Sequence, residues 1–237
     1  MNIIKKIFGR MLESDDLFSV GDIFYTRYND KFHIYKLLKV DSKYKIYHVL
    51  SYSPLDELPE IEKISELEIK ALHFPIAISG FNNPTLLTKT TLTVEDYQGY
   101  YFYLKATGNY EELVAIANEY YNEANLLSEL KQHKLAIEKH SIAIDLFPQF
   151  YESIDNRAFC KMDAGMWEDA IEDFKLSLTV NPGSYLAEFS IGECYMKMGN
   201  YKNAILQFQK AISIDPKQKI GKNFLQKALE LDQQSNL

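Results

Sequence analysis

Three segments of the C-terminal half decide the fold of this chain: HKLAIEKHSIAIDLFP (residues 133–148), MWEDAIEDFKLSLTVNP (residues 166–182) and NYKNAILQFQKAISIDP (residues 200–216). Each segment carries an alanine and ends on a proline, and these positions recur every 34 residues: Ala136, Ala170, Ala204, Pro148, Pro182 and Pro216. A fixed period of this length is typical of helical repeat arrays, in which each unit buries its apolar face against its neighbours. We therefore predict stacked pairs of helices in this half.

Each unit is expected to contain a first helix, a tight turn and a second helix. Gly165 and Gly199 stand where a helix ends in the left-handed conformation, which costs glycine least. Lys131 occupies the same place in the first unit, so we expect a strained turn there. Within the first helices a small residue recurs at Ala124, Ala158 and Gly192. This spacing predicts a close approach between the two helices of each unit.

In these residues the chain resembles the tetratricopeptide repeat family, over three full units at residues 117–216 and a helix at residues 219–232 that shields the last unit from water. Trp167 and Tyr201 fit the positions at the start of the second helices. Departures from the family pattern are local, since His140 replaces an aromatic residue and Ser177 replaces an alanine. The resemblance implies an α-α superhelix made of three units and a capping helix.

The resemblance also implies a groove, lined by the first helices, that binds a peptide or a helix of a partner protein. The residues that it places in this partner-binding groove are Tyr121, Asn125, Asp155, Asn156, Phe159, Met162, Phe189, Glu193 and Met196. Aromatic and methionine side chains surrounded by acids suit a segment that is both apolar and basic. The alternative is that the phenylalanines and methionines pack at the seams between repeats.

Chaperone-binding members of the family hold a C-terminal carboxylate with two asparagines and three basic residues. Asn125 and Asn156 match the asparagine places, whereas Tyr121, Leu186 and Ser190 occupy the basic ones. A carboxylate entering an acidic groove without these cations is repelled. We therefore do not expect this chain to bind heat-shock chaperone tails.

The N-terminal half shows a different pattern. Residues 20–52 alternate β-branched and aromatic residues with turn signals, which predicts an antiparallel meander of three strands. LEIKAL and PIAIS are two further candidate strands, and a short helix is possible near Glu60–Glu66. We predict an α+β protein whose small antiparallel β-sheet, or SH3-like barrel, covers residues 16–92. A connecting helix at 93–108 and the repeat array at 109–237 follow.

Residues 1–15 form an amphipathic segment that is expected to dock on the protein or to touch a membrane surface. The rest of the chain has no stretch near the ~20 apolar residues of a transmembrane helix. Cys160 and Cys194 are expected to be reduced and buried, which fits a cytoplasmic protein.

The net charge of −7 lies mostly in residues 109–237, which carry 13 basic and 19 acidic side chains. This argues against nucleic acid as a partner, because phosphates need a clustered positive surface. The five histidines show no metal-ligand spacing, and no phosphate-binding glycine motif occurs. We therefore expect no catalytic residue, no metal and no cofactor.

Three functions fit these patterns. The first is a non-enzymatic adaptor that binds a protein partner through the repeats. The second is a bacterial immunity protein, because GDIFYTRYNDKFHIYKLLKVD (residues 21–41) weakly resembles the opening of some toxin-neutralising proteins. The third makes the β-domain a ligand-binding or catalytic unit that the repeats regulate, which requires a polar cleft with perturbed titratable groups.

Overall fold

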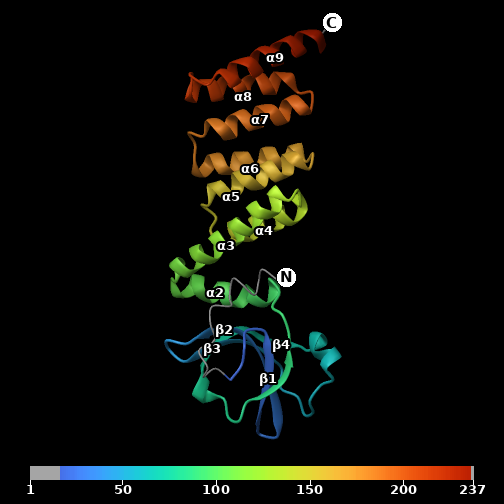
Figure 1. Cartoon of the computed structure of the whole chain (residues 1–237), viewed down its shortest axis with the longest axis vertical. Coiled ribbons are helices and arrows are strands. Elements are labelled where there is room, and N and C mark those ends of the chain that lie inside the picture. The colour runs from blue at the N-terminus through green and yellow to red at the C-terminus, as the bar shows by residue number, and fades with distance from the viewer. Residues whose placement is uncertain (1–16, 236–237) are drawn as a thin grey trace. The chain divides into compact units, whose positions relative to one another are not determined.

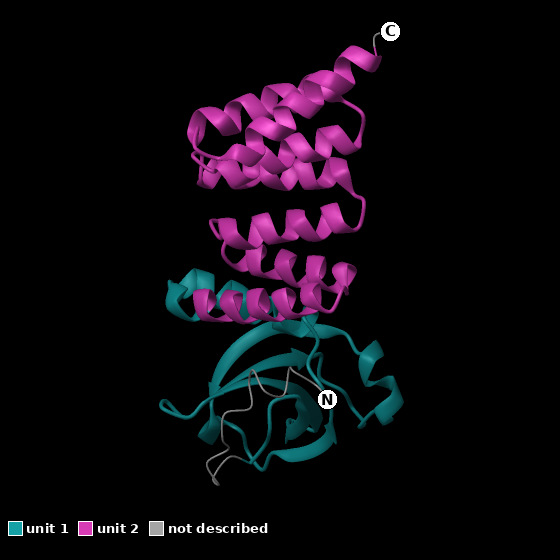
Figure 2. Cartoon of the chain, turned by 45° about the horizontal axis from the view of Figure 1, so that its top comes forward, with its two compact units in different colours: residues 1–112 teal, residues 113–237 magenta. Residues whose placement is uncertain are grey.

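The computed structural model describes residues 17–235 and divides into two compact units, residues 1–112 and residues 113–237 (Figure 2). The segment 1–15 that is expected to be amphipathic lies outside the described residues. The N-terminal unit contains an antiparallel sheet and the C-terminal unit is helical, so the α+β fold class is confirmed.

The sheet of the N-terminal unit, in which Figure 1 labels β1 to β4, has the strand order β4-β3-β2-β1-β5. Its strands are β1 (Asp22–Tyr28), β2 (Lys31–Asp41), β3 (Ile46–Tyr52), β4 (Ile69–Ala77) and β5 (Thr85–Lys89). Each neighbouring pair is antiparallel. The predicted meander is therefore confirmed.

One expectation for this unit was wrong. LEIKAL and PIAIS were expected to form separate strands, whereas residues 69–77 form the single edge strand β4. Pro75 lies inside β4 and is tolerated because an edge strand leaves one row of its backbone groups without a partner strand. The 3₁₀ helix η1 (Ile61–Glu66) lies where the short helix was expected. Closure into an SH3-like barrel stays a prediction.

Aromatic side chains build the core of the sheet. Phe24 is fully buried and stacks on Phe18 with ring centroids 4.5 Å apart. Phe81 meets Phe24 edge to face at 5.0 Å, and Tyr47 lies 6.3 Å from the same ring. These rings provide much of the buried apolar area that stabilises a sheet of this size.

Helix α2 (Gln98–Thr107) follows the 3₁₀ helix η3 (Glu95–Tyr97) and contacts β4. A Cβ atom on Gly99 would lie 2.6 Å from the backbone carbonyl of Leu72, so only glycine permits this approach. The helix ends at Gly108, whose φ of 71° is left-handed. The predicted connecting helix at 93–108 thus corresponds to η3 and α2.

A pair of histidines lies between the sheet and α2. The Nδ1 atom of His48 on β3 and the Nε2 atom of His73 on β4 share a hydrogen bond of 2.9 Å. The rings of Tyr100 and Tyr103 on α2 lie within 5.5 Å of these imidazoles. Burial lowers the pKa of His48 to about 4, with a further contribution from Lys39. Burial and then His48 lower the pKa of His73 to about 4. Both imidazoles are therefore neutral near pH 7.

The C-terminal half folds into three helix pairs and a last helix, which follow one another in chain order (Figure 1). The helices are α3 (Tyr110–Glu129), α4 (His133–Leu146), α5 (Tyr151–Asp163), α6 (Trp167–Val180), α7 (Tyr185–Lys197), α8 (Tyr201–Ile214) and α9 (Lys219–Ser235). Gly165 and Gly199 take left-handed conformations at the turns inside the last two pairs. Lys131 has a φ of 60° at the equivalent turn of the first pair, as expected from the sequence.

The recurring small residues lie where helices approach closely. Ala136, Ala170 and Ala204 are fully buried on the second helices. Gly192 on α7 faces the Phe208 ring of α8, and a Cβ atom there would lie 2.6 Å from that ring. Within the described part of the chain no helix is long and apolar enough to span a membrane.

The histidine pair makes the stability of the N-terminal unit depend on pH. The pKa of each imidazole is about 4 in the fold against an ordinary value of 6.5, so the stabilisation is complete above pH 6.5 and is lost as the pH falls toward 4. Each group contributes a slope of at most about 1.4 kcal/mol per pH unit. Urea unfolding between pH 7.5 and 4.5, followed by tyrosine near-ultraviolet circular dichroism, measures this slope. His140 titrates in the same direction, so the slope assigned to the pair is the part that His48→Gln/His73→Gln removes. An identical slope in that double variant contradicts the assignment.

Substitution of Gly192 tests the close approach of α7 and α8. Gly192→Ala places a methyl group against the Phe208 ring, so we expect the free energy of unfolding to fall by about 1–3 kcal/mol. Gly183→Ala is the matched control, because no atom lies within 4 Å of its added Cβ. Urea denaturation of the full chain measures both variants, and equal effects of the two would refute the packing argument.

Candidate functional site

The predicted groove residues lie on the first helices of the pairs, α3, α5 and α7. Three of them meet directly. The amide Nδ2 of Asn156 on α5 donates to Oδ1 of Asn125 at 2.8 Å and to the Tyr121 hydroxyl at 3.3 Å, both on α3. All three side chains are half-buried. The structure therefore places a polar cluster, partly open to solvent, across the first two repeats.

The ring of Tyr121 is held by aromatic neighbours. Its centroid lies 4.8 Å from that of Phe150 and 5.8 Å from the His140 imidazole. His140 is fully buried, and its Nδ1 atom lies 3.0 Å from the Ser153 hydroxyl. Burial and then Arg157 lower the pKa of His140 to about 4. This histidine is a neutral packing residue near pH 7.

The predicted phenylalanines and methionines pack against the repeat cores. The Phe159 ring meets that of Phe174 edge to face at 5.1 Å. Phe189 is only 6% exposed and lies between Phe208 and Phe224, with centroids 5.4 and 5.1 Å away. Met162 and Met196 are half-buried against the same two cores. These contacts are the ones that the packing alternative describes, and a binding role for these four residues stays a prediction.

The two acids of the predicted groove lie in environments that oppose ionisation. Asp155 is 8% exposed, and burial is the main cause that raises its pKa, while Ser177 lowers it and Glu152 raises it further. Burial also raises the pKa of Glu193, against a smaller opposing effect of Lys197. A cation brought close to either carboxyl group would favour its charged form.

The structure also contains an ion-pair network between α5 and α6 that was not expected from the sequence. Arg157 of α5 binds Asp173 of α6 through two hydrogen bonds of 2.8 and 2.7 Å, and also donates to the Ser141 hydroxyl at 3.0 Å. The Lys161 ammonium lies 2.7 Å from the same Asp173 carboxylate. The one available signal was the i,i+4 spacing of the two cations, which places them on one helix face. The network links α4, α5 and α6.

The two cysteines are free and buried, as expected. Burial raises the pKa of each thiol, to about 12 for Cys194, so neither has the thiolate character of a nucleophile. Within residues 17–235 no group of three or more His, Cys, Asp or Glu side chains is placed to hold a metal ion.

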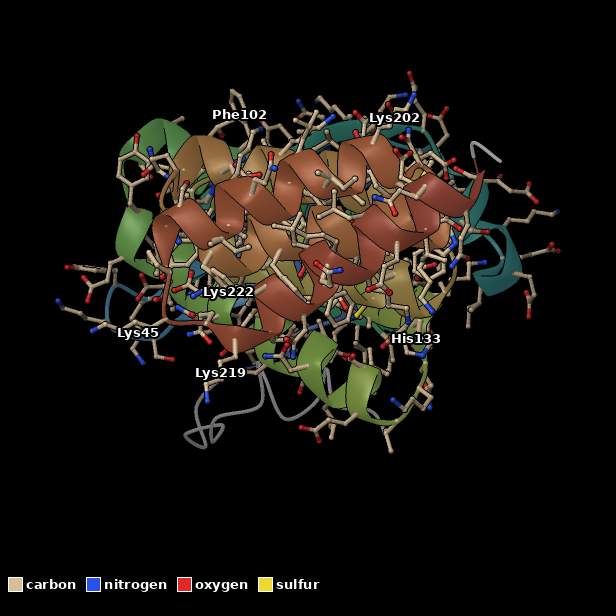
Figure 3. All side chains as sticks on the ribbon, turned by 90° about the horizontal axis from the view of Figure 1, so that it is seen from above. Lys45, Phe102, His133, Lys202, Lys219 and Lys222 are labelled. Carbon is tan, nitrogen blue, oxygen red and sulfur yellow. The ribbon has the colours of Figure 1, made fainter. Side chains whose placement is uncertain are left out.

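Charge is unevenly distributed along the repeats. Residues 109–196 contain 16 acidic and 6 basic side chains, whereas residues 197–237 contain 3 acidic and 7 basic ones. Figure 3 labels three of these lysines on the last two helices, Lys202 on α8 and Lys219 and Lys222 on α9. The acidic surplus therefore lies before α8, in the part of the chain that contains α3, α5 and α7 and also α4 and α6.

The comparisons with known proteins concern this helical half. The family model for the tetratricopeptide repeat matches residues 185–218, which include α7 and α8. No curated protein sequence matches the chain.

Solved structures similar to the chain include the TPR domain of Arabidopsis OM64, at 19% identity and a TM-score of 0.47, covering 49% of this chain and 96% of that one. The Sgt2 TPR domain from Aspergillus fumigatus is 24% identical at a TM-score of 0.47, covering 51% and 81%. The second TPR domain of human RPAP3, solved with an HSP70 peptide, is 17% identical at a TM-score of 0.46, covering 50% and 97%.

Removal of the shared acid tests the buried network. Asp173→Ala leaves Arg157 and Lys161 facing each other without their carboxylate, so we expect a loss of about 3 kcal/mol in the free energy of unfolding. Glu172→Ala is the control. It removes an exposed acid from the preceding position of α6 and should change the free energy of unfolding by less than about 0.5 kcal/mol. Urea denaturation measures both variants, and a small effect of Asp173→Ala would show that the network is not stabilising.

Proposed function

We propose that the tetratricopeptide repeats of the C-terminal half form a non-enzymatic adaptor that binds a segment of a partner protein along α3, α5 and α7. The observation that supports this best is the Asn156–Asn125–Tyr121 cluster, which joins two first helices while staying partly open to solvent. Amide and hydroxyl groups in such a position are suited to hydrogen bonding with a peptide backbone.

The charge of the helices around this cluster, and an exposed leucine on α7, support an apolar and basic partner segment. The helices before residue 197 carry the acidic surplus of the array, and opposite charges favour and steer association. Leu186, at the start of α7, is 49% exposed and offers an apolar contact. Both features match a segment in which basic and apolar residues alternate.

The same geometry supports the expectation that a C-terminal carboxylate is not the ligand. Tyr121 already accepts a hydrogen bond from Asn156, and Ser190 is 1% exposed. Neither supplies the positive charge that a carboxylate requires. The proposal places the protein in the cytoplasm, where its two buried thiols stay reduced.

Peptide selection tests the proposal directly. The full chain is immobilised and used to select dodecapeptides from a random displayed library, and the Kd of each enriched peptide is measured by fluorescence anisotropy. We expect basic and apolar peptides, whose affinity falls at least about tenfold in Glu152→Lys/Leu186→Lys, because two exposed positions on α5 and α7 then repel them.

The control variant reverses the same amount of charge elsewhere. Glu168→Lys/Glu172→Lys changes two exposed acids of α6 and should leave the Kd within about twofold. Failure to enrich any peptide, or equal affinity for wild type and the groove variant, rejects the proposed function.

A further inference from the structure

Asp155 stands where the other two repeats carry an aromatic ring. Tyr121 and Phe189 occupy the equivalent positions, 34 residues before and after it. Those rings pack on the second helix of their own pair, Tyr121 near His140 and Phe189 near Phe208. The middle repeat therefore places a carboxyl group, only 8% exposed, in a site that its neighbours fill with an apolar ring.

Two polar atoms around this site lack partners. Among the described residues, Oδ1 of Asp155 and the Ser190 hydroxyl have no hydrogen-bond partner. The Ser177 hydroxyl interacts with the Asp155 carboxyl group and lowers its pKa. Ser177 is fully buried and Ser190 is 1% exposed. Buried polar groups are usually satisfied, and each one left unsatisfied is costly. Ser177 also replaces the alanines at 143 and 211 of the other units.

The period of the array places these groups together. Asn156 of α5 contacts Tyr121, which lies 35 residues earlier in α3. From the same offset we infer that Ser190 of α7 faces Asp155 of α5. Ser177 of α6 acts on the Asp155 carboxyl group from the second helix of the same pair. One carboxyl group and two hydroxyl groups thus come from three helices.

The described part of the chain supplies no cation to this carboxyl group. Arg157 and Lys161, the basic residues of α5, both bind Asp173 instead. Glu152, one turn earlier on α5, adds negative charge near Asp155. The site is therefore a buried acid with free acceptor capacity and no counter-ion of its own.

We propose that Asp155, with the hydroxyls of Ser177 and Ser190, receives a lysine or arginine side chain of the bound partner segment. An ammonium or guanidinium group carries several N–H donors and no acceptor, which matches a carboxylate beside two hydroxyl oxygens. Pairing also offsets the cost of the buried carboxylate, because an opposite charge within a few ångströms favours its ionised form. This inference rests on the proposed groove function and names the chemistry of its anchor.

A double-mutant cycle tests the anchor with the enriched dodecapeptides described above. In each peptide the basic residues are replaced one at a time by methionine, and every peptide is titrated against the full wild-type chain and against Asp155→Asn. At one peptide position we expect the replacement to weaken binding at least about tenfold in wild type and less than about twofold in Asp155→Asn.

Further variants separate the anchor from a general effect of charge or of folding. Glu168→Gln removes an exposed acid of α6, outside the predicted groove, and should leave the tenfold difference in place. Asp155→Asn removes a buried carboxyl group without a counter-ion, so its thermal unfolding midpoint should equal or exceed that of wild type. Ser177→Ala, which introduces the residue of the other repeats, should reduce the preference for the basic residue while the protein stays folded.

The outcomes distinguish this inference from the function on which it rests. Peptides that lose affinity in the groove variant, yet show no coupling between any basic residue and Asp155, overturn the anchor and leave the adaptor function standing. Failure to enrich peptides rejects both. A coupling of the same size with Glu168→Gln shows that the preference is a general charge effect and also overturns the anchor.

Discussion

The structure of the C-terminal half depends on the close approach of paired helices at small residues. Ala136, Ala170 and Ala204 are fully buried, and the backbone of Gly192 lies directly under the Phe208 ring. A single helix pair leaves apolar surface exposed, so each pair depends on its neighbours for stability. The small residues therefore recur with a period of 34 residues, because each unit repeats the same contacts between its helices.

The middle repeat departs from this apolar scheme. Its neighbours fill their cores with rings and alanines, whereas Asp155, Asp173 and Ser177 lie buried between α5 and α6. Asp173 is fully paired by Arg157 and Lys161, while Asp155 is not. Buried charges that are paired hold helices in register, and a buried charge without a counter-ion is kept at a cost in stability. The proposed anchor role of Asp155 rests on this contrast between two acids on adjacent helices.

Three of the residues selected from the repeat pattern contact one another in the structure. Asn156 meets Tyr121 and Asn125, because neighbouring positions of stacked helices face one another. The repeat pattern did not separate side chains of the predicted groove from side chains of the core. Phe189 is an example, because it was expected in the groove but is only 6% exposed and packs against the Phe208 ring. The network around Asp173 could not be predicted from the repeat period, because its long side chains join helices through contacts that the period does not specify.

The sequence by itself determined the helix pairs, their left-handed turns and the antiparallel meander of β1–β3, because these follow from local spacing and backbone preference. Even the strained turn at Lys131 followed from its place in the period. Only the tertiary structure decided that residues 69–77 form one edge strand, that His48 and His73 share a hydrogen bond, and that Asp155 lies buried without a counter-ion. Each of these depends on atoms that are distant in the chain, and the energy of a charge or a hydrogen bond is set by what surrounds it in space.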